Sequence, residues 1–176
     1  YHSIVCGRPS INLDSWMMPQ RYVIESFRQH SEGADIAIIE GVMGLLDGGD
    51  ASSAEMARIL DLPVILVLDA GGMAETAGAI LYGLKNYDKR LNIAGAILNR
   101  VGSDIHYKMI SEAISGRWGA ELFGYIKKDG AIGIKERHLG LVTAIENRLS
   151  DETIEQLIRA GEEGGDLDAI LKVIEI

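Results

Sequence analysis

The 176-residue sequence has one cysteine and no apolar run near the length of a membrane span. A single cysteine, Cys6, cannot form an internal disulfide framework or a cysteine-rich zinc site, so the cytoplasm is the expected compartment. A membrane-spanning helix needs about 20 apolar residues, and the first residues do not have the pattern of a signal peptide. We therefore expect a cytoplasmic protein with no membrane partner.

Positive charge is also scarce. The chain has 17 Lys and Arg against 26 Asp and Glu, which gives a net charge of -9. The basic residues are scattered, whereas nucleic-acid binding usually needs a basic face, so we expect no nucleic-acid partner. Because 47% of the residues are hydrophobic, the chain can form one globular domain with a substantial core.

Two nucleotide-binding motifs are missing. The phosphate loop G-x-x-x-x-G-K-[ST] does not occur, and no Gly-Lys dipeptide is present. Without that lysine and its cradle of backbone amides, we expect this chain by itself to hold a triphosphate poorly. No G-x-G-x-x-G opens a helix, which argues against a dinucleotide enzyme. The four histidines lack metal-ligand spacing, and we interpret them as surface or turn residues.

Strand-like and helix-like segments alternate at the spacing of α/β proteins, and the nearly continuous apolar strands favour a parallel sheet covered on both faces. The second helix has Ser52 or Ser53 as its expected cap. Helices are expected over residues 19–30, 53–60, 74–87, 104–117, 150–161 and after 166, strands over 35–40, 63–69, 93–99 and 121–126, and a loop over 127–137.

The most informative segment covers residues 36–49, where an apolar run ends at Glu40 and a turn with four glycines brings in Asp47. A carboxylate at the carboxyl end of a buried strand lies where open α/β sheets bind ligands. Glu40 suits Mg²⁺, which takes oxygen ligands. Asp47 could bind the ion, orient a substrate or act as a base. The alternative is an acidic surface loop without a ligand.

Polar residues end three of the expected strands: Glu40, Asp69 and Asn99. The carboxyl ends of parallel strands meet at one edge of a sheet, so these side chains could line one crevice. The amide of Asn99, which Arg100 follows, has donors and acceptors that suit the edge of a nucleobase. The alternative is that Asn99 only initiates a turn.

Five ordered segments resemble the synthetase domain of the cobyrinic acid a,c-diamide synthase family. The resemblance covers about residues 1–148 and rests on Tyr1-His2 with the following Gly7-Arg8-Pro9 and Asn12 to Met17, on Ile39 to Gly48, on Leu62 to Ala70, on Ile93 to Ser103, and on Glu136 to Leu141.

The resemblance implies a dethiobiotin-synthetase-like P-loop NTPase fold followed by a glutamine amidotransferase domain. Such enzymes use ATP and Mg²⁺ to phosphorylate two acetate side chains of a corrinoid, and ammonia released from glutamine then displaces each phosphate. The family's phosphate loop would precede Tyr1 and its glutaminase nucleophile would follow Ile176. We therefore expect a fragment that is inactive alone, with a partial amidoligase domain over 1–148 and a helical segment over 149–176.

The resemblance also implies roles for individual residues. Glu40 is expected to bind Mg²⁺ and Asp47 to lie beside the macrocycle carboxylate, both in catalysis, while Asn99 is expected to read adenine. The remaining expected contacts are Tyr1, His2, Asn12 and Asp14 with the tetrapyrrole, and Arg100, Glu136, Arg137 and His138 with the nucleotide.

Three alternatives remain open. The substrate could be a nickel-sirohydrochlorin, with the same chemistry, or the chain could be a non-catalytic tetrapyrrole-binding module. A partitioning-type ATPase shares the fold but usually needs a basic surface. A domain that lacks its first strand also exposes a sheet edge, so a homodimer is a further expectation.

Overall fold

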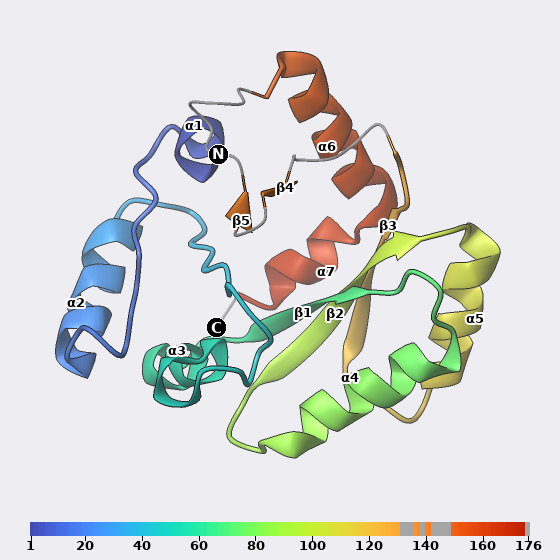
Figure 1. The fold of residues 1–176 in the computed structure, drawn as a ribbon, viewed down its shortest axis with the longest axis horizontal. Coiled ribbons are helices and arrows are strands. Elements are labelled where there is room, and N and C mark those ends of the chain that lie inside the picture. Colours follow the sequence, from blue (N-terminus) through green and yellow to red (C-terminus); the bar gives the residue numbers. More distant parts are fainter. Residues whose placement is uncertain (131–135, 138–139, 142–148, 175–176) are drawn as a thin grey trace.

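The computed structural model describes residues 1–130, 136–137, 140–141 and 149–174. Figure 1 shows a parallel sheet with helices around it. The elements in chain order are α1 (His2–Cys6), α2 (Gln20–Ser31), the 3-10 helix η1 (Gly49–Ala51), α3 (Ser53–Leu60), β1 (Val64–Asp69), α4 (Glu75–Tyr87), β2 (Ile93–Val101), α5 (Asp104–Ile114), β3 (Glu121–Lys127), β4 (Glu136–Arg137), β5 (Gly140–Leu141), α6 (Asp151–Gly164) and α7 (Leu167–Lys172).

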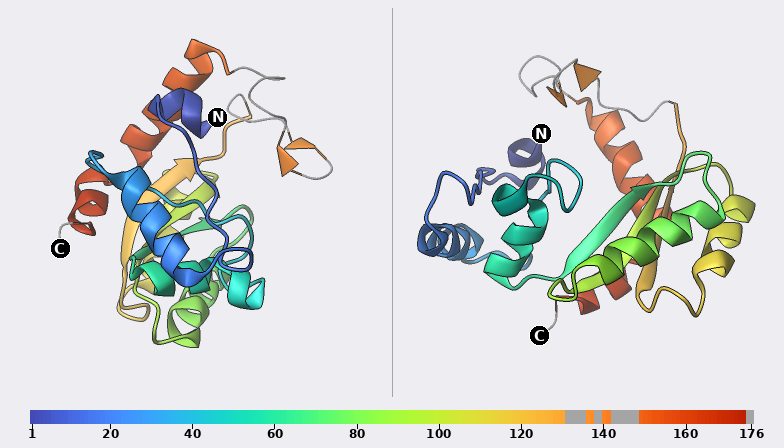
Figure 2. Two further views of the ribbon diagram at one scale, coloured as in Figure 1. Left: turned by 90° about the vertical axis from the view of Figure 1, so that its left-hand side faces the viewer. Right: turned by 60° about the horizontal axis from the view of Figure 1, so that its bottom comes forward.

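The sheet has the order β1-β2-β3, and both pairs of strands are parallel. The connecting helices α4 and α5 lie together on one face, while α6 and α7 lie against β3, the strand farthest from β1 (Figures 1 and 2). The first residues, with α1 and α2, lie beside α3 on the β1 side of the sheet (Figure 2). The expected α/β fold with a parallel sheet is confirmed.

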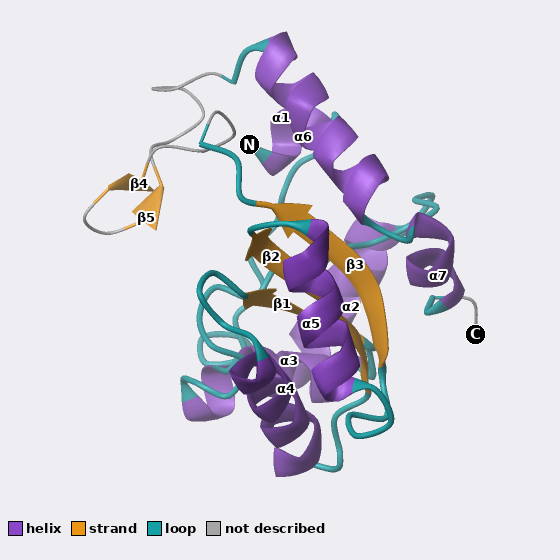
Figure 3. Ribbon diagram, turned by 90° about the vertical axis from the view of Figure 1, so that its right-hand side faces the viewer, coloured by secondary structure: helices purple, strands orange, loops and turns teal. Residues whose placement is uncertain are grey.

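The core forms where small residues let the layers approach. The central strand β2 contributes Ala96, Leu98 and Val101, all fully buried. A Cβ at Gly95 would collide with the buried Phe123 ring of β3, so glycine is what allows these strands to pack. Figure 3 shows the three strands of this sheet with their covering helices.

One expected strand is absent. Residues 35–40 have no regular secondary structure, and the side chain of Ile38 is 89% exposed. Within the described chain, β1 pairs only with β2, and residues 35–40 pair with no strand. A strand exists only through hydrogen bonds to a neighbour, so an apolar run that lacks one stays irregular. The prediction that Glu40 ends a strand is therefore wrong for this structure.

Other differences are local. Residues 136–137, expected in a loop, form β4, which pairs antiparallel with β5. The helix expected to run to Arg117 ends at Ile114, and the short α1 was not expected. In the described residues, none of the helices has the length and apolar character needed to cross a membrane.

Candidate functional site

Two of the three expected strand-end residues meet at the carboxyl edge of the sheet. Asp69 is the last residue of β1, and its partner in the parallel register is Asn99 of β2. The strands stay paired just beyond this point, because the backbone N–H of Ala70 donates to the Asn99 carbonyl at 2.8 Å. This pairing confirms that Asp69 and Asn99 lie at one edge of the sheet, whereas Glu40 ends no strand; a shared crevice stays a prediction.

A bulge in β2 places Arg100 at the same edge. Leu98 and Val101 are three residues apart, but their partners on β3, Tyr125 and Lys127, are only two apart. Arg100 lies in this bulge with a φ of 56° in the left-handed region, which is uncommon for a non-glycine residue. Bulges redirect side chains and are frequent beside functional sites.

Arg100 makes a two-pronged ion pair with Asp69. Its Nε donates to Asp69 Oδ1 at 2.9 Å, and its Nη2 donates to Asp69 Oδ2. Asp69 Oδ1 also accepts the backbone N–H of Gly71 at 2.9 Å. Hydrogen bonds from Arg100, and then from Gly71, lower the pKa of the Asp69 carboxyl, so it is ionised at neutral pH.

His106 connects the loops that follow β1 and β2. Its Nδ1 accepts the backbone N–H of Gly102 at 3.1 Å, which leaves Nε2–H to donate to the carbonyl of Met73. These two bonds assign the neutral Nε2–H tautomer to the ring. The interpretation of His106 as a surface or turn residue is wrong, because it lies half-buried in the first turn of α5, where it links the two loops.

Glu40 lies in a second group, next to the start of the chain. Its Oε2 is 3.4 Å from Nε2 of His2, and both side chains are more than 60% exposed. Tyr1 caps α1 at its amino end and His2 is the helix's first residue. Neither Glu40 nor His2 forms a hydrogen bond or ion pair with Asp69 or Asn99, within the part of the chain that the structure describes.

Asp47 is held in a tight turn after Glu40. Its backbone N–H donates to the Gly44 carbonyl at 3.0 Å, and its exposed carboxylate lies so close to Gly44 that a Cβ there would collide with it. Gly48 follows with a φ of 102°, which a glycine adopts readily. The glycines therefore keep the Asp47 carboxylate at the surface, close to the chain segment that carries Glu40.

The other residues expected at the tetrapyrrole make only local hydrogen bonds or none. Asp14 Oδ1 accepts the backbone N–H groups of Trp16 and Met17 at 2.8 and 3.0 Å, a turn-forming role. Asn12 is exposed and makes no side-chain hydrogen bond to a described residue. Of the residues expected at the nucleotide, Glu136 and Arg137 form β4, and His138 lies outside the described residues.

These residues could bind Mg²⁺ only together with water and a bound substrate. In the described ranges, no three His, Cys, Asp or Glu side chains converge to hold a metal. Mg²⁺ keeps several waters and is usually bound through one or two carboxylates plus substrate phosphates, so the exposed Glu40 carboxylate is a suitable partial donor set. Its role as a magnesium ligand stays a prediction.

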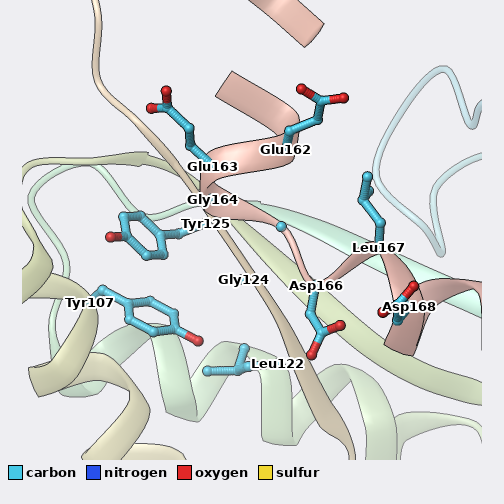
Figure 4. A pocket seen from close by; sticks show the side chains of 11 residues that line it. Tyr107, Leu122, Gly124, Tyr125, Glu162, Glu163, Gly164, Asp166, Leu167 and Asp168 are labelled. Carbon is cyan, nitrogen blue, oxygen red and sulfur yellow. The ribbon is translucent and has the colours of Figure 1, made fainter. Parts of the chain in front are cut away.

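A cavity of about 560 Å³ lies elsewhere, between β3, α5 and the α6–α7 junction (Figure 4). The rings of Tyr107 and Tyr125 stack at 4.3 Å on one side, and acidic residues such as Glu162 and Asp166 line the other. The Tyr125 hydroxyl donates to Asp104 at 2.6 Å. None of the residues expected in the site lines this cavity.

Sequence reasoning missed the links between the site residues. It singled out Asp69, Asn99 and Arg100 but not the ion pair that joins them, and it gave no role to His106. The sequence did indicate that Asp69 and Asn99 end neighbouring strands. Arg100 reaches Asp69, however, only because β2 contains a bulge, and no sequence pattern predicts that bulge.

Comparison with known families identifies the domain. A model of the family described as "AAA domain" matches residues 12–133. The chain belongs to this AAA domain family. The match supports the P-loop NTPase-like character of the α/β fold and implies nucleotide binding. No solved structure matches the chain.

Curated relatives of this AAA domain chain carry a common name. Proteins named cobyrinate a,c-diamide synthase match from Picrophilus torridus (44% identical over 98% of this chain), Gloeobacter violaceus (43% over 100%) and Salmonella typhimurium (38% over 98%). The resemblance expected from the sequence motifs is confirmed. The chain spans about two fifths of these relatives, at 40%, 40% and 39% of their lengths.

Proposed function

We propose that this chain is part of an ATP- and Mg²⁺-dependent, glutamine-hydrolysing amidoligase that converts the a and c acetate carboxylates of cobyrinic acid to amides. The observation that carries the proposal is the similarity, over nearly the whole chain, to proteins named cobyrinate a,c-diamide synthase. The carboxyl edge of the sheet, where Asp69, Asn99 and Arg100 meet, supports a ligand site of the kind found in open α/β folds.

The chemistry requires activation of a carboxylate, which is a poor acyl donor. ATP with Mg²⁺ would supply the phosphoryl group that makes each acetate an acyl phosphate, and ammonia would then displace phosphate. Glu40 would hold the metal. Asp47 would lie beside the macrocycle carboxylate and position it, and the amide of Asn99 would bind adenine. His2 lies next to Glu40, and it would face the tetrapyrrole together with Tyr1.

The test is an amidation assay on the gene's full product. The protein is incubated with glutamine, ATP, Mg²⁺ and either cobyrinic acid or nickel-sirohydrochlorin, and mass spectrometry counts the carboxylates converted to amides. We expect two amidations of cobyrinic acid. Amidation of only the nickel macrocycle would move the proposal to that substrate, and binding of either macrocycle without amidation would identify a non-catalytic binding module.

Glu40→Gln tests the metal role. It removes the charge that binds Mg²⁺ while keeping the side-chain size, so we expect amidation to fall by at least about a hundredfold, in the range of lost electrostatic stabilisation. Glu121→Gln is the matched control, because Glu121 begins β3 at the opposite edge of the sheet. Equal activity of both variants would remove Glu40 from the mechanism.

A further inference from the structure

The orientation of the Asn99 side chain is fixed by its neighbour. Asn99 Oδ1 accepts the backbone N–H of Arg100 at 2.9 Å. A backbone N–H can only donate, so the oxygen of the carboxamide, and not its nitrogen, must face Arg100. The amino group Nδ2 then points away, and it donates to none of the residues that the structure describes.

That orientation depends on Arg100 staying in an uncommon backbone conformation. Arg100 has a φ of 56°, and a non-glycine residue keeps such a conformation only when its surroundings enforce it. The bulge between Leu98 and Val101 gives the backbone this path. The guanidinium is held at its far end by both oxygens of Asp69, a geometry that fixes direction as well as distance.

Asp69 is in turn fixed to its own strand. Its Oδ1 accepts the Gly71 N–H, and the loop beyond Gly71 is joined to the loop after β2 through Met73 and His106. The chain of contacts therefore runs from β1 through the Asp69 carboxylate and the Arg100 guanidinium to the Arg100 backbone and the Asn99 amide. The contacts between residues are hydrogen bonds, and the Arg100 side chain itself connects the guanidinium to the backbone N–H that bonds to Asn99.

The ion pair contributes little to stability by itself. The side chains of Asp69 and Arg100 are 49% and 60% exposed, and exposed ion pairs usually contribute at most about 1 kcal/mol. Variants that break it should therefore still fold. A change in the orientation of Asn99 can then be measured apart from a loss of stability.

We propose that Asp69 is a positioning residue which, through Arg100, holds the Asn99 carboxamide with its oxygen inward and its amino group outward. The site then presents hydrogen-bond donors to its ligand and selects a base that has an acceptor nitrogen on the facing edge. The inference rests on the proposed nucleotide site for its ligand, and on the described contacts alone for the orientation of Asn99.

The first experiment needs no nucleotide. Amide exchange by NMR on the full chain measures protection of the Arg100 N–H, which bonds to Asn99 Oδ1, and the spectrum also reports the Asn99 side-chain amide. In Asp69→Asn and Arg100→Lys, we expect protection to fall about tenfold and the Asn99 amide signal to shift. Unchanged protection and an unmoved Asn99 signal in Asp69→Asn would overturn the proposal.

Asp88→Asn is the matched control. Asp88 also pairs with arginines, Arg58 and Arg90, but it follows α4 and precedes β2, away from the carboxyl edge. Its loss removes two ion pairs that are more buried than the Asp69–Arg100 pair, so the variant controls for a general loss of stability. We expect the Arg100 and Asn99 signals to stay in place in this variant.

The second experiment measures base selectivity in the gene's full product, using ATP, 7-deaza-ATP and 1-deaza-ATP. The wild type should bind at least one deaza analogue about fivefold to tenfold more weakly than ATP, because an amide donor loses its acceptor. In Asp69→Asn this ratio should approach one, whereas a purely structural effect would weaken all three ligands equally. Equal ratios in wild type and variant would refute the positioning role.

The two experiments fail separately. If the full product binds none of the three nucleotides, the proposed nucleotide site is wrong, and the exchange measurement still decides whether Asp69 orients Asn99. If nucleotides bind but the exchange of Arg100 and the signal of Asn99 do not respond to Asp69→Asn, the site stands and the positioning role does not.

Discussion

Gly124 of β3 and Gly165, just after α6, face each other in an isolated antiparallel bridge. Beside it, the Asp166 N–H donates to the Phe123 carbonyl at 2.7 Å. Gly124 has a φ of 116°, and a Cβ at this position would collide with the Gly164 carbonyl oxygen. The backbones can approach this closely only because side chains are missing, and the contact covers the outer edge of β3.

Replacing Gly124 with alanine should therefore destabilise the fold by at least about 2 kcal/mol, because the new Cβ is strained by the backbone and blocked by the neighbouring chain. Urea unfolding measures the loss. Gly130→Ala is the control: Gly130 follows the same strand, and its Cβ would meet nothing within 4 Å. Similar midpoints for Gly124→Ala and wild type would show that the close contact is absent in solution.

Two glycines of α4 should respond in opposite directions. Gly83 faces open space, so Gly83→Ala should stabilise the helix by about 0.5–1 kcal/mol. At Gly78 a Cβ would lie 2.5 Å from Cγ2 of Ile114 in α5, so Gly78→Ala should cost about 1–3 kcal/mol. Thermal unfolding of both variants measures the difference. A stabilising Gly78→Ala would contradict the close packing of α4 on α5.

Two adjacent serines separate a helix cap from a helix interior. The sequence left Ser52 and Ser53 as alternatives, and the structure selects Ser52, whose buried Oγ accepts the Glu55 N–H at 3.2 Å. We expect Ser52→Ala to cost about 1 kcal/mol of unfolding free energy, and Ser53→Ala to change it by less than about 0.5 kcal/mol. Equal losses in chemical denaturation would argue against the cap.

Acid should weaken the protein partly through Asp88. Hydrogen bonds from the Arg90 side chain and backbone, with the charge of Arg58, hold the pKa of the Asp88 carboxyl well below its ordinary value. A lowered carboxyl pKa stabilises the folded state above the unfolded pKa of about 4, and this contribution is lost as the pH falls.

Asp88→Asn should therefore be less stable than wild type at about pH 6, and the difference should shrink towards about pH 3. Urea unfolding across this range checks the slope. Glu112→Gln serves as the control, because Glu112 pairs with Lys108 only at 3.8 Å on an exposed helix face. A constant difference between wild type and Asp88→Asn would rule out the linkage.

The sequence predicted most of the elements because their signals are local. The apolar runs that end at Asp69 and Asn99 form strands β1 and β2, and the helices of 74–87 and 104–117 match α4 and α5 to within a few residues. A run such as 35–40 has the same local signal. Whether it becomes a strand depends on a neighbouring strand, which its own residues do not encode.

The candidate site was predictable at the level of single residues but not of contacts. Parallel strands that end in polar residues place Asp69 beside Asn99 by register alone. The position of the Arg100 side chain depends on a bulge against β3 and on a φ of 56°, both set by packing across the sheet. The pairing of His2 with Glu40 likewise joins two segments that are far apart in the sequence, and no pattern in the residues predicts their contact.

The uneven distribution of the core has a dynamic consequence. Its hydrophobic cluster begins at Ala54, and earlier in the described chain only Val23, Ser26 and Ser52 are buried. The strands and helices of residues 64–127 are joined by short loops, so their contacts are close in sequence and this part of the chain should fold first. The first fifty residues, which carry His2 and Glu40, should then open and close on a faster timescale while the sheet stays intact.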